Sequence, residues 1–300
     1  MGLATAKAFA EAGAAVVLAD FNEEAVRTAA DALVAAGHKA LAVRCDVSDD
    51  AQVAAMVDRT VAAFGRLDAA FNNAGVMARI APTAESTRED WDRVTGVNLR
   101  GVWSCMRHEL KQMERQGTGA IVNNASVGAL TGNPGIGSYI ASKHGVVGLT
   151  RTAALEYVKR GIRVNAVNPG LIDTQGARDV VAGDESAYAE IAKGVPIGRA
   201  GRPEEIAAAV LWLCSPGASE ANEDRVDGPP GAPTSRPPTP GQAGRGSQGR
   251  GRRAASGVPC RRRGRTAGVR HCRLRPSGAV SIAHHTTVIP PSTVRAWPTT

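Results

Sequence analysis

The chain of 300 residues is poor in aromatic side chains (4%), and none of its five cysteines forms a CxxC pair. The cysteines, at positions 45, 105, 214, 260 and 272, lack the spacing of a zinc site or a disulfide framework. We therefore expect no metal and a reducing, cytoplasmic location. No signal-peptide pattern opens the chain. No apolar run approaches the ~20 residues that span a bilayer, so no membrane partner is expected.

Positive charge is unevenly distributed along the sequence. The net charge is +8, but residues 220–300 hold 14 arginines, no lysine and 4 acidic residues. The first 219 residues therefore carry a slight acidic excess, and the basic character belongs to the tail alone. A strongly basic balance favours acidic partners such as nucleic acids. That inference applies only to the tail.

The tail, residues 220–300, contains 11 of the 17 prolines and runs such as GRGSQGRGRR. It shows no sustained hydrophobic period, so we predict that it is disordered. Binding of RNA or DNA by its arginines is one hypothesis. Only Trp297 offers an aromatic ring for stacking, so we favour a nonspecific polycation without a specific nucleic-acid partner. The lysine-free text also resembles GC-rich DNA read out of frame, and a frameshift is a further hypothesis.

Residues 1–219 alternate between short apolar runs and stretches with helical periodicity. Wholly apolar strands indicate a parallel sheet buried between helices, and the alternation predicts a doubly wound, Rossmann-like α/β fold. The predicted strands are Ala15–Ala19, Ala40–Arg44, Ala69–Asn72, Ala120–Asn123 and Ile162–Val167. The predicted helices are Gly2–Ala12, Glu23–Ala36, Ala51–Phe64, Arg88–Gln116, Tyr139–Val158 and Pro203–Cys214. Such sheets bind ligands at the carboxyl ends of their strands.

Tyr139 and Lys143 are the sharpest chemical feature. Four residues apart on a predicted helix, they share one face. A free tyrosine, with a pKa of about 10, is a poor base at neutral pH, and a nearby ammonium is expected to lower that pKa. A tuned phenol can exchange a proton with an alcohol or carbonyl oxygen.

Two further polar residues fit the same chemistry. Ser126 follows the strand Ala120–Asn123, and its hydroxyl could bond a substrate oxygen; the alternative is a loop serine. Asn98 lies within the predicted helix Arg88–Gln116, where its amide could hold a water in a proton relay or could cap a kink.

Several residues at strand ends suit a dinucleotide. Asp20 could accept hydrogen bonds from ribose hydroxyls and repel a 2′-phosphate, which favours NAD over NADP, or it could cap a helix. Asp46 could bond adenine or cap a turn. The Asn72–Gly75 run (NNAG) allows close backbone approach to a flat ligand. Gly2 alone reads as an ordinary helix start.

Taken together, NNAG at 72–75, Asn98, Ser126, the YxxxK at 139–143 and the NPG at 168–170 resemble the classical short-chain dehydrogenase/reductase family in order and spacing. The resemblance extends over about residues 2–219. It implies an NAD-dependent oxidoreductase that transfers a hydride between the cofactor and a secondary alcohol or ketone. It also implies a homodimer or homotetramer formed through the long helices.

The resemblance implies a role for each matching residue. The resemblance implies four catalytic residues. Asn98 anchors a water of the proton relay, and Ser126 binds the substrate oxygen. Tyr139 is the acid/base, and Lys143 tunes the pKa of this tyrosine. Lys143 also holds ribose. The implied cofactor contacts are Gly2, Asp20, Asp46, Val47, Asn73, Ala74, Gly75, Tyr139, Lys143, Pro169, Gly170, Ile172 and Thr174. The substrate loop corresponds to about Gln175–Arg199.

Two departures from the family pattern stand out. The opening strand and early glycines of the TGxxxGxG turn are absent before Met1-Gly2, so we expect an N-terminally incomplete sheet with exposed edges. After Pro216 the usual final strand is reduced to Val226-Asp227-Gly228, so we expect that strand to be missing too. The alternative function is therefore a non-catalytic remnant of the family that cannot hold a cofactor.

Overall fold

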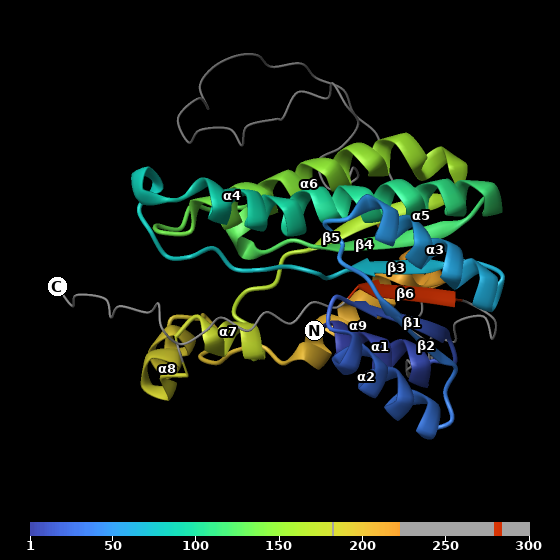
Figure 1. Cartoon of the computed structure of the whole chain (residues 1–300), viewed down its shortest axis with the longest axis horizontal. Coiled ribbons are helices and arrows are strands. Elements are labelled where there is room, and N and C mark those ends of the chain that lie inside the picture. The colour runs from blue at the N-terminus through green and yellow to red at the C-terminus, as the bar shows by residue number, and fades with distance from the viewer. Residues whose placement is uncertain (182, 223–278, 284–300) are drawn as a thin grey trace, which may run out of the picture. The chain divides into compact units, whose positions relative to one another are not determined.

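The computed structural model describes residues 1–181, 183–222 and 279–283. The strands in this part of the chain are β1 (Ala15–Asp20), β2 (Ala40–Arg44), β3 (Ala69–Asn72), β4 (Gly119–Asn124), β5 (Ile162–Val167) and β6 (Ala279–Ala283). The helices are α1 (Gly2–Glu11), α2 (Glu23–Ala35), α3 (Asp50–Phe64), α4 (Arg88–Thr95), α5 (Val102–Gln116), α6 (Gly137–Tyr157), α7 (Gln175–Asp179), α8 (Glu185–Lys193) and α9 (Pro203–Cys214). The Rossmann-like α/β prediction is confirmed (Figure 1).

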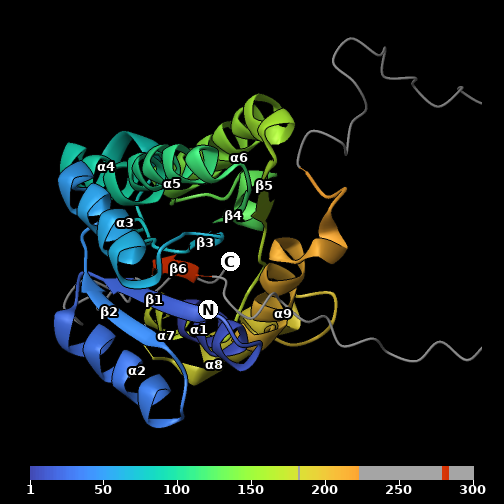
Figure 2. The same cartoon turned by 90° about the vertical axis from the view of Figure 1, so that its right-hand side faces the viewer.

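The six strands form one sheet in the order β2-β1-β6-β3-β4-β5, and every pair is parallel. Helices cover both faces (Figure 2). Val17 of β1 faces the cluster formed with α3, α5 and α6, whereas Val16 and Leu18 face the cluster formed with α1, α2 and α9. The strands are apolar on both faces because both faces are buried. All strand carboxyl ends meet at one edge.

Local sequence explains several helix boundaries. The Asn22 side chain accepts from the N–H of Ala25 and begins α2. Asp49 accepts from the N–H groups of Ala51 and Gln52 and begins α3. Gly65 ends α3 at φ 78°, a conformation that glycine adopts without strain. These caps place the loops after β1 and β2 at the ligand-binding edge.

The predicted helix Arg88–Gln116 contains an interruption. A π-helical turn, Gly96–Gly101, lies between α4 and α5. Its two glycines tolerate the wider turn, and π turns of this kind are often found at functional sites. The turn carries Asn98, and whether this residue serves the turn or a proton relay stays a prediction.

The strand β6 differs from the prediction for the tail. Five residues of the segment expected to be disordered, Ala279–Ala283, pair with both β1 and β3. We expected the edges of β1 and β3 to be exposed, but β6 lies between these two strands and pairs with both. The reason is physical: unpaired backbone groups in the middle of a sheet need partners, and AVSIA is an apolar run without charge or proline. The other tail residues after Asn222 lie outside the described residues.

At the other end of the sheet, β5 is the outermost described strand, as expected if the final strand is missing. Asn222 partly covers it, because its Oδ1 accepts from the N–H of Val164 at 3.1 Å. The variable loop, in which no helix was predicted, contains α7 and α8. In the described ranges, no helix is long and apolar enough to cross a membrane.

Candidate active site

Ser126, Tyr139 and Lys143 converge at the carboxyl end of β4. Tyr139 and Lys143 lie on the first turns of α6, with the Lys143 Nζ 5.7 Å from the centre of the Tyr139 ring. Ser126 follows β4, and its Oγ accepts from the N–H of Gly128 at 3.1 Å. Because that bond uses only a lone pair, the hydroxyl proton of Ser126 is available for another oxygen.

The protonation of these groups is set by burial. Burial raises the pKa of Tyr139, and its hydrogen bond with Ser126 offsets part of the rise. Burial lowers the pKa of Lys143 to about 8. The lowering of the tyrosine pKa by Lys143, expected from the sequence, does not outweigh burial in this structure. It stays a prediction for the site with its ligand.

Lys143 is held in place by a single main-chain contact. Its Nζ donates to the carbonyl oxygen of Asn124 at 2.7 Å, and the side chain is 3% exposed. A Cβ placed on Gly75 would lie 3.6 Å from this Nζ and 3.4 Å from the Oδ1 of Asn98. The backbone at Gly75 therefore lies close to both an ammonium and an amide.

Asn98 clamps the segment that follows β3. The N–H of Val76 donates to its Oδ1 at 2.7 Å, and its Nδ2 donates to the Val76 carbonyl at 2.9 Å and to the Ser142 Oγ at 3.3 Å. Both amide hydrogens are thus used within the protein. The side-chain amide is therefore not free to donate a hydrogen bond to a water. A role for Asn98 in a proton relay stays a prediction, and donation by this amide does not supply it.

A buried polar network supports β3 and β4 beneath these residues. The Nδ2 of Asn72 donates to the Oε2 of Glu109 at 3.0 Å and to the Oδ1 of Asn123 at 2.9 Å, and Asn123 donates to Thr150. Burial raises the pKa of the Glu109 carboxyl to about 7, and the bond from Asn72 opposes part of this rise. Glu109 gave no signal in the sequence, because a glutamate on an amphipathic helix usually faces solvent.

Asp20 is the last residue of β1, and Asp46 lies between β2 and α3. Both lie at the same edge of the sheet. Asp20 is 3% exposed, and its Oδ1 accepts from the N–H of Asn22 at 2.9 Å. The Oδ1 of Asp46 accepts from the N–H and the Oγ of Ser48 at 2.9 and 2.7 Å. Asp46 therefore caps a turn, as one interpretation of the sequence had it, whereas Asp20 does not cap α2, whose N-cap is Asn22. Both carboxylates lie where a bound adenosine is expected.

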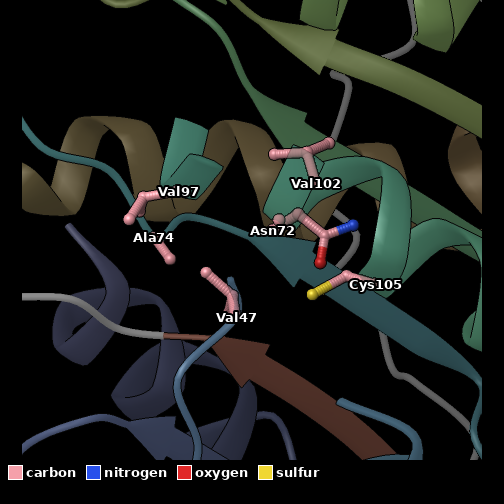
Figure 3. Close-up of a pocket in the computed structure, with 7 residues that line it drawn as sticks. Val47, Asn72, Ala74, Val97, Val102 and Cys105 are labelled. Carbon is pink, nitrogen blue, oxygen red and sulfur yellow. The ribbon is translucent and has the colours of Figure 1, made fainter. Parts of the chain in front are cut away.

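Val47 lines a narrow gap beside β3. The side chains of Asn72, Ala74, Val97, Val102 and Cys105 line it together with Val47 (Figure 3), and Gly101 completes the lining. A Cβ on Gly101 would come within 2.8 Å of the Val47 Cγ2. The gap is walled mainly by small and branched apolar side chains from three stretches of the chain, and it is too narrow to hold a water molecule. The adenine contact implied for Val47 stays a prediction.

The remaining predicted contacts lie on loops around the same edge. Gly2 begins α1, whose N-terminus has no side-chain cap. Asn73 bonds to Asn124, whereas Ala74 continues the same loop. The Pro169 carbonyl accepts from the N–H of Val127 at 3.0 Å, which joins the segment Pro169–Gly170 to the Ser126 loop. Thr174 caps α7 by accepting from the N–H of Ala177, and Ile172 pairs with Gly201.

These residues fit a dinucleotide cofactor. An uncapped helix N-terminus suits a pyrophosphate, carboxylate oxygens at strand ends suit ribose hydroxyls, and a lysine lies close to Gly75. Among the described residues no cluster of histidine, cysteine and carboxylate side chains could hold a metal ion. The fold and site together define a dinucleotide-binding oxidoreductase with a Ser-Tyr-Lys arrangement.

Comparison with known proteins identifies the family. Residues 1–224 match the family profile described as Enoyl-(Acyl carrier protein) reductase. Cis-4-hydroxycyclohexanecarboxylate dehydrogenase of Sinomonas cyclohexanicum is 47% identical over 220 residues, which are 73% of this chain and 86% of that protein. Cyclohexanol dehydrogenase of Acinetobacter sp. (strain SE19) is 43% identical over 219 residues, 73% and 85% of the two chains.

Solved structures agree with this result. The crystal structure of levodione reductase has a TM-score of 0.71 and 39% identity, covering 74% of this chain and 88% of that one. That of NAD+-bound xylitol dehydrogenase has a TM-score of 0.70 and 34% identity, covering 74% and 90%. The chain belongs to the short-chain dehydrogenase/reductase family of oxidoreductases.

Proposed function

We propose that this chain oxidises a secondary alcohol, or reduces the corresponding ketone, on a small cyclic molecule with NAD as its cofactor. The convergence of Ser126, Tyr139 and Lys143 near Gly75, at the carboxyl end of β4, carries the proposal. Relatives named for cyclohexanol and for a hydroxycyclohexanecarboxylate support a cyclic substrate. A structure with NAD and another with NADPH support a nicotinamide cofactor.

The nicotinamide supplies the group that accepts or donates the hydride. The protein residues orient the substrate and move its proton. Ser126 donates its hydroxyl proton to the substrate oxygen. Tyr139 accepts the proton of the alcohol as the carbon is oxidised, and returns it to the carbonyl oxygen in the reverse direction.

Lys143 supports this proton transfer in two ways. Its positive charge, adjacent to the phenol, stabilises the phenolate, and its remaining N–H groups are available to ribose hydroxyls. Its main-chain anchor fixes the ammonium near Tyr139. The other roles implied by family resemblance, including contacts of Pro169–Thr174 with the nicotinamide, are part of the same proposal.

The preference for NAD rests on Asp20. Its buried carboxylate at the end of β1 would bond the adenosine ribose and would repel a 2′-phosphate. Two negative charges close together repel each other more strongly where solvent is excluded, because the effective dielectric constant is lower there.

Titration of the purified 300-residue chain with NADH and NADPH, followed by nicotinamide fluorescence, tests the proposal. We expect NADH to bind more tightly than NADPH. A screen of cyclic secondary alcohols with NAD should then show NADH formation at 340 nm. Binding of neither nucleotide would contradict the proposal and would support the non-catalytic alternative.

A further inference from the structure

Asn124, the last residue of β4, is assigned no role by the catalytic chemistry above. Successive side chains on a strand point to opposite faces of the sheet. Asn123 bonds to Thr150 on the α6 side, so Asn124 points to the side of α1 and α9. There its Nδ2 donates to the Oδ1 of Asn73 at 3.1 Å. The two amides therefore meet at the carboxyl edge, on the face where α1 begins.

The Oδ1 of Asn124 is buried and makes no hydrogen bond within the described residues. The whole residue is 5% exposed. Rotating its amide by 180° gives no relief, because its oxygen would then face the oxygen of Asn73. Rotating both amides leaves an unpaired NH₂ group instead. A buried polar atom without a partner is costly, so in the amide arrangement that the structure shows this position calls for a hydrogen-bond donor.

The surroundings indicate where that donor comes from. The main-chain oxygen of the same residue accepts from the Lys143 Nζ at 2.7 Å. Asn124 thus contacts the lysine expected to hold ribose through its main chain, and through its side chain it contacts Asn73, on the loop expected to run along the cofactor. Within this site the ligand groups that donate a hydrogen bond and lie beside that lysine are ribose hydroxyls.

We propose that Asn124 is a further cofactor-binding residue whose side-chain oxygen accepts a hydrogen bond from a hydroxyl of the nicotinamide-side ribose. The inference rests on the proposed function. It also explains why β4 ends in two asparagines with different tasks: Asn123 supports the buried network, whereas Asn124 faces the ligand.

The test compares three ligands by calorimetry: NADH, ADP-ribose, which keeps the distal ribose, and ADP, which lacks it. Asn124→Leu removes the oxygen at similar volume. We expect this substitution to lower the affinities for NADH and ADP-ribose about tenfold, which is the effect of losing one hydrogen bond. The affinity for ADP should change less than about twofold. Asn124→Thr, which restores an acceptor, should recover part of the loss.

Asn165→Leu is the matched control, because Asn165 is also 5% exposed and lies on β5 with a bond to the Ala221 carbonyl. It should lower the unfolding midpoint without changing the ratio of the three affinities. Equal weakening of all three ligands by Asn124→Leu would indicate general damage and overturn the proposal. Unchanged binding, or weakening of NADH alone, would also overturn it. If the unmutated chain binds none of the three, the proposed function fails as well.

Discussion

The catalytic corner (Asn98, Ser126, Tyr139 and Lys143) and the adenosine corner (Asp20, Asp46 and Val47) are built differently. In the catalytic corner, Asn98 bonds to residues 22 and 44 positions away, and Lys143 bonds 19 positions away. In the adenosine corner, Asp20 and Asp46 bond to residues two positions away. One corner depends on the assembled sheet and helices, whereas the other is formed largely by local turns. Substitutions should therefore affect the two corners differently.

The largest effect should come from removing the catalytic phenol. Tyr139→Phe is expected to lower turnover about 10³-fold, because the acid/base group is lost. The affinity for NADH should change little, as measured by fluorescence titration. Tyr157→Phe, at the far end of α6, is the control and should retain turnover. Turnover of Tyr139→Phe near the unmutated level would refute its role.

The second effect concerns the network beneath the catalytic corner. The Glu109 pKa of about 7 lies above its usual value of 4.5, so the folded state binds a proton that the unfolded chain releases. Stability should therefore fall as pH rises from about 4.5 to 7. Glu109→Gln should abolish this loss and gain roughly 3 kcal/mol above pH 7, with little change near pH 4.5.

Urea unfolding at several pH values measures this difference. Glu114→Gln, which replaces an exposed glutamate of the same helix and leaves Glu109 in place, is the control and should keep the pH-dependent loss of stability of the unmutated chain. A Glu109→Gln curve parallel to that of the unmutated chain would mean that the carboxyl is charged in the folded protein across this range.

In the adenosine corner, Asp20→Ser should reduce the preference for NADH over NADPH by roughly tenfold. The substitution removes the charge that repels a 2′-phosphate, whereas turnover at saturating cofactor should stay nearly constant. Asp31→Ser on the exposed face of α2 controls for the change in net charge. An unchanged ratio of the two dissociation constants would remove Asp20 from the ribose site.

The smallest effect is expected at the gap that Val47 lines beside β3. Gly101→Ala places a methyl group 2.8 Å from the Val47 Cγ2, so Val47 must move. The affinities for NADH and ADP should both fall about threefold, and the rate of the chemical step should not change. Gly148→Ala on α6 meets no atom within 4 Å and is the control. Selective loss of turnover in Gly101→Ala would mean that the two corners are coupled.

The sequence was informative where local pattern decides structure. The strands Ala40–Arg44, Ala69–Asn72 and Ile162–Val167 have the predicted bounds, because apolar runs between turn residues define them. The helix carrying Tyr139 and Lys143 was also predicted. Spacing within one helix fixes their separation, so the paired phenol and ammonium could be inferred without tertiary information.

The rest depended on contacts between distant residues. Glu109 is 37 positions from Asn72, and no local pattern distinguishes it from a surface glutamate. The strand β6 lies in an arginine- and proline-rich segment whose composition favours disorder. It forms a strand only because β1 and β3 leave a position between them with unpaired backbone groups. The unpaired oxygen of Asn124 likewise emerges only when β3 and β4 are adjacent.

The place of β6 in the sheet bears on how this protein is made. Among the described elements β6 is the last to leave the ribosome, yet it is a central strand of the sheet. During synthesis β1 and β3 are present long before the strand that joins them. Contacts between segments so far apart form slowly, and the two halves expose pairing edges while they wait. The nascent chain therefore has a prolonged period in which chaperones, or other nascent chains, compete for the centre of its sheet.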